Sequence, residues 1–184
     1  NRVLVARIGW MRWYKGPQDG DQKPVGGGSF NDGDTGSEIF TFKEVNGDLY
    51  GYVQTPNSEI NLSRIDPLIE AESDRLNGVT VIFVATDPNA PPGPDRQKIV
   101  GWYLDAAVLR RSAKHPARAE YDYNLQAPAA KAVLVLPHRR EHSIKRQSGS
   151  IGQANIWYPR DEDGRLRKAK WLRDAITYID SYAA

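Results

Sequence analysis

The sequence predicts one α+β domain, in which a curved, mostly antiparallel sheet of about six strands closes into a small barrel with peripheral helices. Short runs rich in Val and Ile recur along the chain with turn residues between them, which is typical of a sheet of short strands. Helical spacing of apolar residues is confined to two segments. The 184 residues suit a single domain, and neither a repeat nor a linker divides residues 1–184.

The expected strands differ in length and pattern. Val79–Ala85 has the length and the β-branched composition of a fully buried strand. Asn46-Gly47, between two of the runs, is a dipeptide typical of a type I′ hairpin turn. Ile99–Tyr103 and Ala107–Arg110 form either a strand pair or one bulged strand. The remaining runs are Val3–Ile8, Phe40–Phe42, Leu49–Gln54 and Ala132–Leu136.

Two helices are expected. Pro67–Leu76 follows Asp66, a residue suited to an N-cap, and ends before Asn77-Gly78. Arg165–Tyr182 carries apolar residues at helical spacing, which predicts a terminal helix that packs on the sheet. Trp171 lies on that apolar stripe, so we assign it to packing and not to a site.

Composition bounds the environment and the partners. The chain has no cysteine, which excludes disulfides and cysteine-ligated zinc and fits a reducing compartment. No apolar run is long enough for a membrane span and the first residues lack a signal-peptide pattern, so we expect a cytoplasmic protein without a membrane partner. The net charge is only +2, yet residues 138–173 hold ten Lys or Arg against four Asp or Glu. This basic region indicates either a polyanionic partner or a solvated helix face.

No set of residues assembles a catalytic or metal site. His138 and His142 have i,i+4 spacing, but HRREH lacks the zinc-protease pattern and has no third ligand. Residues 15–36 and 87–95 are expected as loops, and the first contains the glycine-rich run GGGSFN at residues 26–31. That run lacks the Lys-Ser/Thr ending of a P-loop, although its backbone N–H groups could approach a ligand. We therefore expect no catalysis by this chain alone, and neither a metal nor a cofactor.

The aromatic residues are rich in Trp and Tyr, since five Trp and nine Tyr accompany four Phe. Many stand in adjacent pairs at predicted strand ends, as in SGSIGQANIWYP at residues 148–159, where Trp157 and Tyr158 follow a polar segment. Flat rings beside amide side chains are suited to stack on a nucleobase and to hydrogen-bond its edge. The alternative is that one ring of each pair packs in the core and the other is half-exposed.

Five stretches together resemble one family. They are RIGWMRWYKG, GGGSFND followed by TGSEIFTF, LYGYVQ, IVGWYLDAAVLRR and SGSIGQANIWYP. Over residues 2–160 the arrangement is similar to the modified-base reader domains of bacterial modification-dependent restriction endonucleases. These are the EVE-type readers of the PUA superfamily, related to YTH and SRA domains and often fused to an HNH nuclease. In YTH readers an Asn-x-Trp segment supplies a cage tryptophan, and Asn155–Trp157 looks similar.

The resemblance implies a PUA-like barrel that accepts a base flipped out of duplex DNA and tests it for 5-methylcytosine, 5-hydroxymethylcytosine or N6-methyladenine. The chain has no HNH pattern, so any nuclease would lie beyond Ala184 or in another subunit. The expected protein is thus the specificity module of a modification-dependent restriction endonuclease. Two alternatives stay open, because related barrels serve several functions: an RNA-binding PUA-like module, and an enzyme with a small-molecule pocket under GGGSFN.

The residues expected at the site fall into two groups. The modified-base pocket is expected to contain Trp10, Trp13, Ser29, Phe30, Asn31, Trp102, Tyr103, Gln153, Asn155 and Trp157. The contacts to the nucleic-acid backbone are expected from Arg139, Arg140, Lys145, Arg146, Ser148 and Arg160. Because side chains alternate along a strand, one of Trp102 and Tyr103 should face the pocket and the other should point away.

Overall fold

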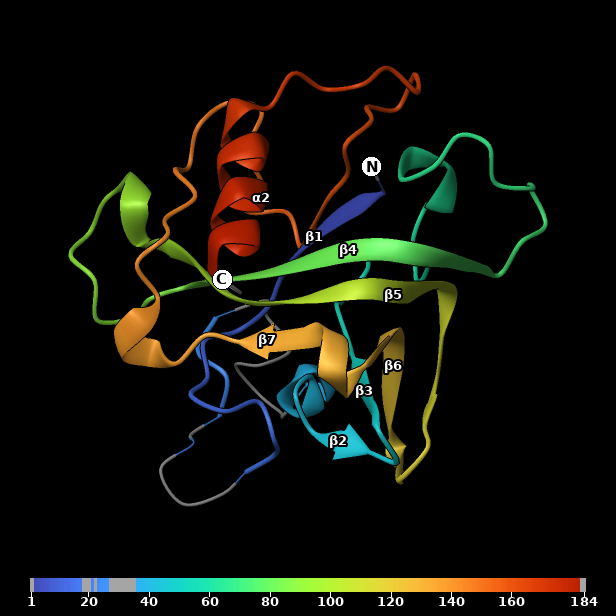
Figure 1. Cartoon of the computed structure of the whole chain (residues 1–184), viewed down its shortest axis with the longest axis horizontal. Helices are drawn as coiled ribbons and strands as arrows, with labels where there is room; N and C mark the ends of the chain where they lie inside the picture. The colour runs from blue at the N-terminus through green and yellow to red at the C-terminus, as the bar shows by residue number, and fades with distance from the viewer. Residues whose placement is uncertain (1, 18–20, 22, 27–35, 183–184) are drawn as a thin grey trace.

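The computed structural model describes residues 2–17, 21, 23–26 and 36–182. Its strands form one eight-stranded sheet with the order β2-β3-β6-β5-β4-β1-β8, and β7 pairs with β5 beside this path. The class is α+β, as predicted. The described strands form an open sheet, so the predicted closure into a barrel is not observed among them (Figure 1).

The elements have the following bounds. The strands are β1 (Val3–Arg7), β2 (Glu44–Val45), β3 (Asp48–Gly51), β4 (Arg75–Thr86), β5 (Gln97–His115), β6 (Arg118–Pro128), β7 (Ala132–Leu134) and β8 (Ile156–Trp157). The α-helix of the described part of the chain is α2 (Lys170–Tyr182). Short 3-10 helices occupy Ser37–Phe40, Leu62–Arg64, Pro94–Arg96, Ala129–Lys131 and Pro137–Arg139. β1 and β4 are parallel, whereas the other strand pairs are antiparallel.

Each face of the sheet carries an apolar core. Alternation along β1 sends Leu4 and Ala6 to one face and Val3 and Val5 to the other. The first face packs against buried side chains of residues 36–65. The second, which we call the helix face, lies under α2, whose Ala175 and Ile179 are buried (Figure 1). The amphipathic pattern of the terminal helix therefore predicted its role correctly, although the helix begins at Lys170 and not at Arg165.

The long central strands follow the sequence pattern. β4 contains the whole predicted run Val79–Ala85, and all seven of those residues except Thr80 are buried. β5 is one strand of 19 residues with register shifts against β4 and β6, so the bulged-strand alternative is confirmed. The Asn46-Gly47 hairpin is also confirmed, because φ is 51° at Asn46 and 88° at Gly47, and a type I′ turn requires positive φ at both positions.

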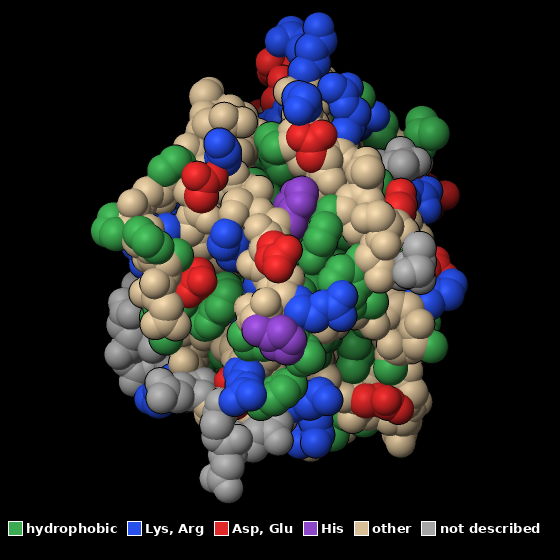
Figure 2. Space-filling view, turned by 60° about the vertical axis from the view of Figure 1, so that its left-hand side comes forward, with side chains coloured by type: hydrophobic (Ala, Val, Ile, Leu, Met, Phe, Trp, Pro, Cys, Tyr) green, Lys and Arg blue, Asp and Glu red, His purple; other side chains and the backbone are tan. Residues whose placement is uncertain are grey.

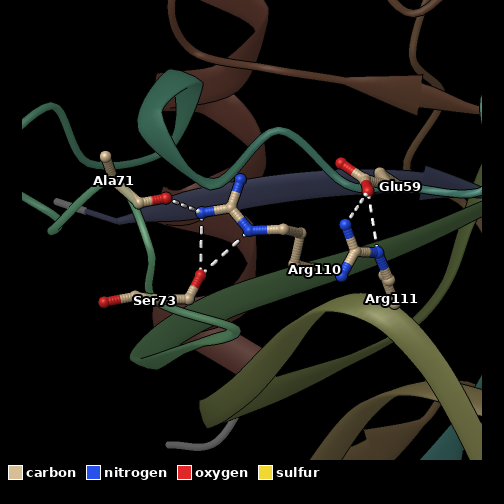
Figure 3. Close-up of polar contacts among 5 residues, drawn as sticks. All are labelled: Glu59, Ala71, Ser73, Arg110 and Arg111. Atoms are coloured by element: carbon tan, nitrogen blue, oxygen red, sulfur yellow. Dashed lines mark hydrogen bonds and ion pairs between the residues drawn. The ribbon is translucent and has the colours of Figure 1, made fainter.

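The predicted helix at Pro67–Leu76 does not form. Residues 67–74 form turns and bends, and Arg75 and Leu76 already belong to β4. Leu68 is 89% exposed, so an apolar helix face would have had little to pack against. Instead of helical hydrogen bonds, hydrogen bonds from a side chain of β5 hold this segment (Figure 3). The Arg110 guanidinium donates to the carbonyls of Ala71 and Ser73, and Arg111 pairs with Glu59 at 2.6 Å. Hydrogen bonds from Arg110 of β5 to carbonyls of this segment therefore outweigh the local propensity for a helix.

Two predicted strands are shorter or absent. Phe40–Phe42 is not a strand, because Phe40 ends a 3-10 helix and Thr41 and Phe42 continue into a turn that buries both phenyl rings. The run Ala132–Leu136 contributes only the three half-buried residues of β7. Phe40 and Phe42 instead pack in the core of the first face, and β7 pairs with β5 at Gly101–Tyr103.

Candidate nucleic-acid interface

One edge of the sheet gathers loops from three parts of the chain. β1 and β4 are parallel, with Arg7 opposite Val84, so their carboxyl ends meet at the same edge. Residues 8–17 follow β1 here, and the connection from β4 to β5 starts here. β8 begins here as well, because the Arg7 N–H donates to the Asn155 carbonyl at 2.7 Å. We call this region the carboxyl edge; in open α/β sheets, ligands bind beside such strand ends.

The loop after β1 is fixed from within by Asp21. This buried carboxylate accepts the backbone N–H groups of Arg12, Trp13 and Tyr14 at 2.8, 2.8 and 3.1 Å. Tyr14 has φ of 53°, a left-handed conformation that costs a non-glycine residue about 1–3 kcal/mol. Its hydroxyl donates to the Gly9 carbonyl at 2.7 Å, and burial raises its pKa well above the usual range. The surrounding contacts therefore hold a strained backbone in one conformation.

Arg140, from a distant part of the chain, also holds this loop in place. Its guanidinium is only 4% exposed and donates to the carbonyls of Val135, Met11 and Arg12 at 2.8, 2.7 and 3.1 Å. It also lies 4.5 Å from the centre of the Trp10 ring. Burial lowers the pKa of Arg140, while Tyr14 and the nearby acids act in the opposite direction. Arg140 was predicted to contact phosphate; in the free chain it is instead buried, and three of its five N–H groups donate to carbonyls.

A hollow of about 450 Å³ lies against the fixed loop, and we call it the Trp10 hollow. Trp10 is half-buried on its wall, and Asn89 reaches it from the loop after β4. Exposed Arg12 and Lys23 supply positive charge. The full lining is Trp10, Met11, Arg12, Asp21, Lys23, Val25, Pro88 and Asn89.

A second hollow of about 410 Å³ lies at the end of β1, and we call it the Arg7 hollow. Three of its residues carry side-chain amides, and one carries a hydroxyl. The Arg7 guanidinium contacts the Asn155 Oδ1 at 3.1 Å and the Gln153 carbonyl. The full lining is Arg7, Gln54, Thr55, Pro56, Gln153, Ala154 and Asn155.

The structure corrects the pocket assignment of three aromatic residues. Trp157 is 3% exposed on the helix face, where its indole N–H donates to the Gly149 carbonyl at 3.0 Å and its ring packs edge-on against Trp171. Trp102 is 1% exposed and packs against Tyr182 of α2. Tyr103 points to the opposite face, as alternation predicted, but it is also fully buried and donates to the Thr41 carbonyl. All three rings are core residues, so none lines either hollow.

The other predicted pocket residues divide between the two hollows or lie outside them. Trp10 lines the first hollow, and Trp13 stands half-buried beside it in the same fixed loop, with the Arg12 guanidinium 4.8 Å from its ring centre. Gln153 and Asn155 line the second hollow. Ser29, Phe30 and Asn31 lie outside the described residues.

The predicted backbone-contacting residues do not form one group. Lys145 and Arg146 are exposed near the start of β5, where the Arg146 N–H donates to the Pro94 carbonyl. Ser148 is exposed in the following turn. Arg139 lies over Tyr182 of α2 at 4.8 Å, and Arg160 follows the opposite end of β8 and donates to the Gly164 carbonyl. Figure 2 shows the Lys and Arg side chains of one face interspersed with acidic and hydrophobic ones.

Sequence reasoning missed Arg7 and the structural role of Asp21. Arg7 is the last residue of an apolar strand, and only the register of β8 brings it beside Asn155. Asp in a Gly-rich loop often accepts nearby backbone N–H groups, but residues 15–36 contain four Asp, so this signal did not single out Asp21. In the described part of the chain, no three His, Asp or Glu side chains are placed to hold a metal ion, and no helix could cross a membrane.

Comparisons of the chain with protein-family models, with curated proteins and with solved structures gave no match.

Proposed function

We propose that this chain binds DNA carrying a modified base, and that the base is flipped out of the duplex into the Trp10 hollow. The proposal takes from the family resemblance the PUA-like class of barrel, the bacterial cytoplasm and the role of specificity module in a modification-dependent restriction endonuclease. The bases it would test are 5-methylcytosine, 5-hydroxymethylcytosine and N6-methyladenine. Cleavage would be the task of a nuclease domain or subunit, and the chain itself would use no cofactor.

The observation that carries the proposal is the half-buried Trp10 on a strained loop that Asp21 and Arg140 hold in place. Strained backbone that is held by its surroundings clusters at ligand sites. A ring that is fixed before the ligand arrives loses little conformational entropy when a base stacks on it. The hollow of about 450 Å³ beside this ring lies in the range of about 300–1,000 Å³ that is typical of small-molecule sites.

The polar groups of the Trp10 hollow suit a nucleotide better than an apolar ligand. Arg12 and Lys23 are exposed at the hollow and can neutralise phosphates next to the flipped base. The Asn89 amide offers both a donor and an acceptor to a base edge. Base recognition of this kind stacks the flipped base on an aromatic ring and reads its edge by hydrogen bonds.

The test compares Trp10→Ala with wild type on duplexes that differ only in one modified base. Loss of one stacking ring should cost about 1–3 kcal/mol, a roughly five- to 150-fold weaker affinity for the modified duplex. Affinity for the unmodified duplex should change little, because that binding depends on phosphates. The matched control is Trp171→Ala, which removes another half-buried Trp, from the helix face, and should keep the preference for the modified duplex.

Two results would contradict the proposal. If the wild-type chain binds modified and unmodified duplexes with equal affinity, it does not recognise the modified base. Tighter binding to RNA hairpins than to any DNA would favour the RNA-binding alternative, which the same titrations include.

A further inference from the structure

Arg7 is a half-buried cation with an incomplete set of partners. Its Nη2 contacts the Asn155 Oδ1 and the Gln153 carbonyl. Its Nε is buried and has no hydrogen-bond partner among the described residues, and no described acid forms an ion pair with the guanidinium. A guanidinium has five N–H donors in a planar fork. The two donors of Nη2 have partners and Nε is buried, so the two donors of Nη1 remain for a ligand in the hollow that Arg7 lines.

The charge around Arg7 is unbalanced. Burial lowers the pKa of Arg7, the positive charge of Arg146 lowers it further, and the Glu38 carboxylate raises it by a smaller amount. A partly buried charge is costly unless a counter-charge and hydrogen bonds compensate it. The Asn155 and Gln153 oxygens are neutral acceptors, so they satisfy hydrogen bonds without supplying a counter-charge. An anion in the Arg7 hollow would supply it.

We propose that the Arg7 hollow is a binding site for a phosphate oxyanion, held by the Arg7 guanidinium and by the donors of Gln54, Thr55 and Gln153. An Arg fork binds two oxygens of a phosphate in parallel, which gives both affinity and orientation. The side chains of Gln54, Thr55 and Gln153 line the hollow and have N–H or O–H groups to donate. Arg146 adds long-range attraction for an anion.

The source of the phosphate connects this site to the Trp10 hollow, and this step rests on the proposed function. Arg7 and Trp10 are three residues apart, so their Cα atoms are separated by at most about 11 Å. One nucleotide could therefore place its base beside Trp10 and a neighbouring backbone phosphate on Arg7. Free inorganic phosphate has the same chemistry and is the other possible source.

The first experiment uses inorganic phosphate alone as the probe. The thermal unfolding midpoint of the wild-type chain should rise saturably with phosphate, beyond the effect of NaCl at equal ionic strength. Arg7→Gln should bind phosphate about tenfold or more weakly, because a charge-assisted fork is lost. Arg64→Gln is the matched control: Arg64 is also half-buried and also donates to a carbonyl, but it lies outside the hollow. Gln54→Ala keeps both hydrogen bonds of the Arg7 side chain, so it should weaken phosphate binding even if Arg7→Gln fails to fold.

The second experiment titrates an unmodified duplex at several salt concentrations. If the phosphate comes from DNA, Arg7→Gln should lower the magnitude of the slope of log K against log salt by about one. A saturable phosphate effect without any duplex binding would keep the anion site and overturn the proposed function. Two results would overturn the anion site: phosphate could stabilise the wild-type chain no more than NaCl does, or Arg7→Gln could bind phosphate as tightly as wild type. If Trp10→Ala still loses the preference for the modified duplex, the proposed function stands in either case.

Discussion

The four tryptophans outside α2 differ in exposure although their sequence contexts are alike. Trp102 and Trp157 are 1% and 3% exposed and lie under α2, whereas Trp10 and Trp13 are half-buried in the loop after β1. Each of them stands beside another aromatic residue or beside a glycine, so local sequence does not separate core rings from site rings. What separates them is the register of β1 with β8 and the position of α2, which are long-range features.

Trp157→Ala tests the core assignment of Trp157. The substitution removes a buried ring and its hydrogen bond to Gly149, so it should lower the free energy of unfolding by about 3–5 kcal/mol. Trp157→Phe should lose less, because a ring remains. Urea unfolding measures the change, and affinities for modified and unmodified duplexes should fall together if they fall at all. If the Trp157→Ala chain stays stable and loses only its preference for the modified duplex, the core assignment is wrong and Trp157 contacts the base.

His115 predicts a dependence of stability on pH. Its ring is 2% exposed against Phe40 and Tyr50, and burial lowers its pKa, helped by Arg118 and opposed by Glu120. The folded chain therefore resists a proton that the unfolded chain binds near pH 6.5. The stabilising contribution is complete above that pH and is lost as the pH falls toward and through the lowered pKa. Protonation would also break the hydrogen bond that the Nδ1 accepts from the Ala117 N–H.

Urea unfolding between pH 5 and pH 8 measures this effect, with the range set by the ordinary histidine pKa of about 6.5. His115→Gln should flatten the acid side of the stability curve, leaving a smaller slope from His142, whose pKa is lowered chiefly by burial. His138→Gln is the control, because His138 is exposed, and it should keep the wild-type curve. A wild-type curve that is flat or rises toward pH 5 would show that His115 is not buried as a neutral ring.

At the scale of elements, patterns that depend on a few adjacent residues were predictable. Asn46-Gly47 determined its turn because positive φ at both positions is a local requirement. The run Val79–Ala85 became β4 because a continuous β-branched stretch can be buried on both faces. The prediction of a helix at Pro67–Leu76 was wrong because the helical pattern is weak. The contacts that determine the conformation of this segment come from Arg110, about forty residues later in the chain.

The candidate site was predictable only in part, for the same physical reason. Trp10, Gln153 and Asn155 were expected at one site, and they do lie at the carboxyl edge, in two hollows. The parallel pairing of β1 with β4, which creates that edge, has no signature in either strand. Arg140 was misassigned because a buried guanidinium and a phosphate-binding one look identical in sequence. Their difference is the set of carbonyls that the fold brings to them.

At the scale of the whole molecule, the basic residues divide between two regions. Lys145 and Arg146 lie near the carboxyl edge, since the Arg146 N–H donates to the Pro94 carbonyl and Lys145 is 3.9 Å from Asp95, both in the β4–β5 connection. Lys168 and Arg173 are exposed before and within α2. Figure 1 places the chain before α2 on the opposite side of the molecule from the loop after β1. A nucleic acid bound at the carboxyl edge would contact the first pair and not the second.

Two double variants with the same change in net charge distinguish these regions. Lys145→Gln with Arg146→Gln should lower the magnitude of the salt slope of duplex binding by about two, because each lost phosphate contact lowers it by about one. Lys168→Gln with Arg173→Gln removes equal charge from the α2 region, so it should leave the slope unchanged and cost only the weak, long-range part of the attraction. Affinities measured over a range of NaCl concentrations give both slopes. If only Lys168→Gln with Arg173→Gln lowers the magnitude of the slope, the nucleic acid binds on the side of α2. Neither hollow would then have a role in its binding.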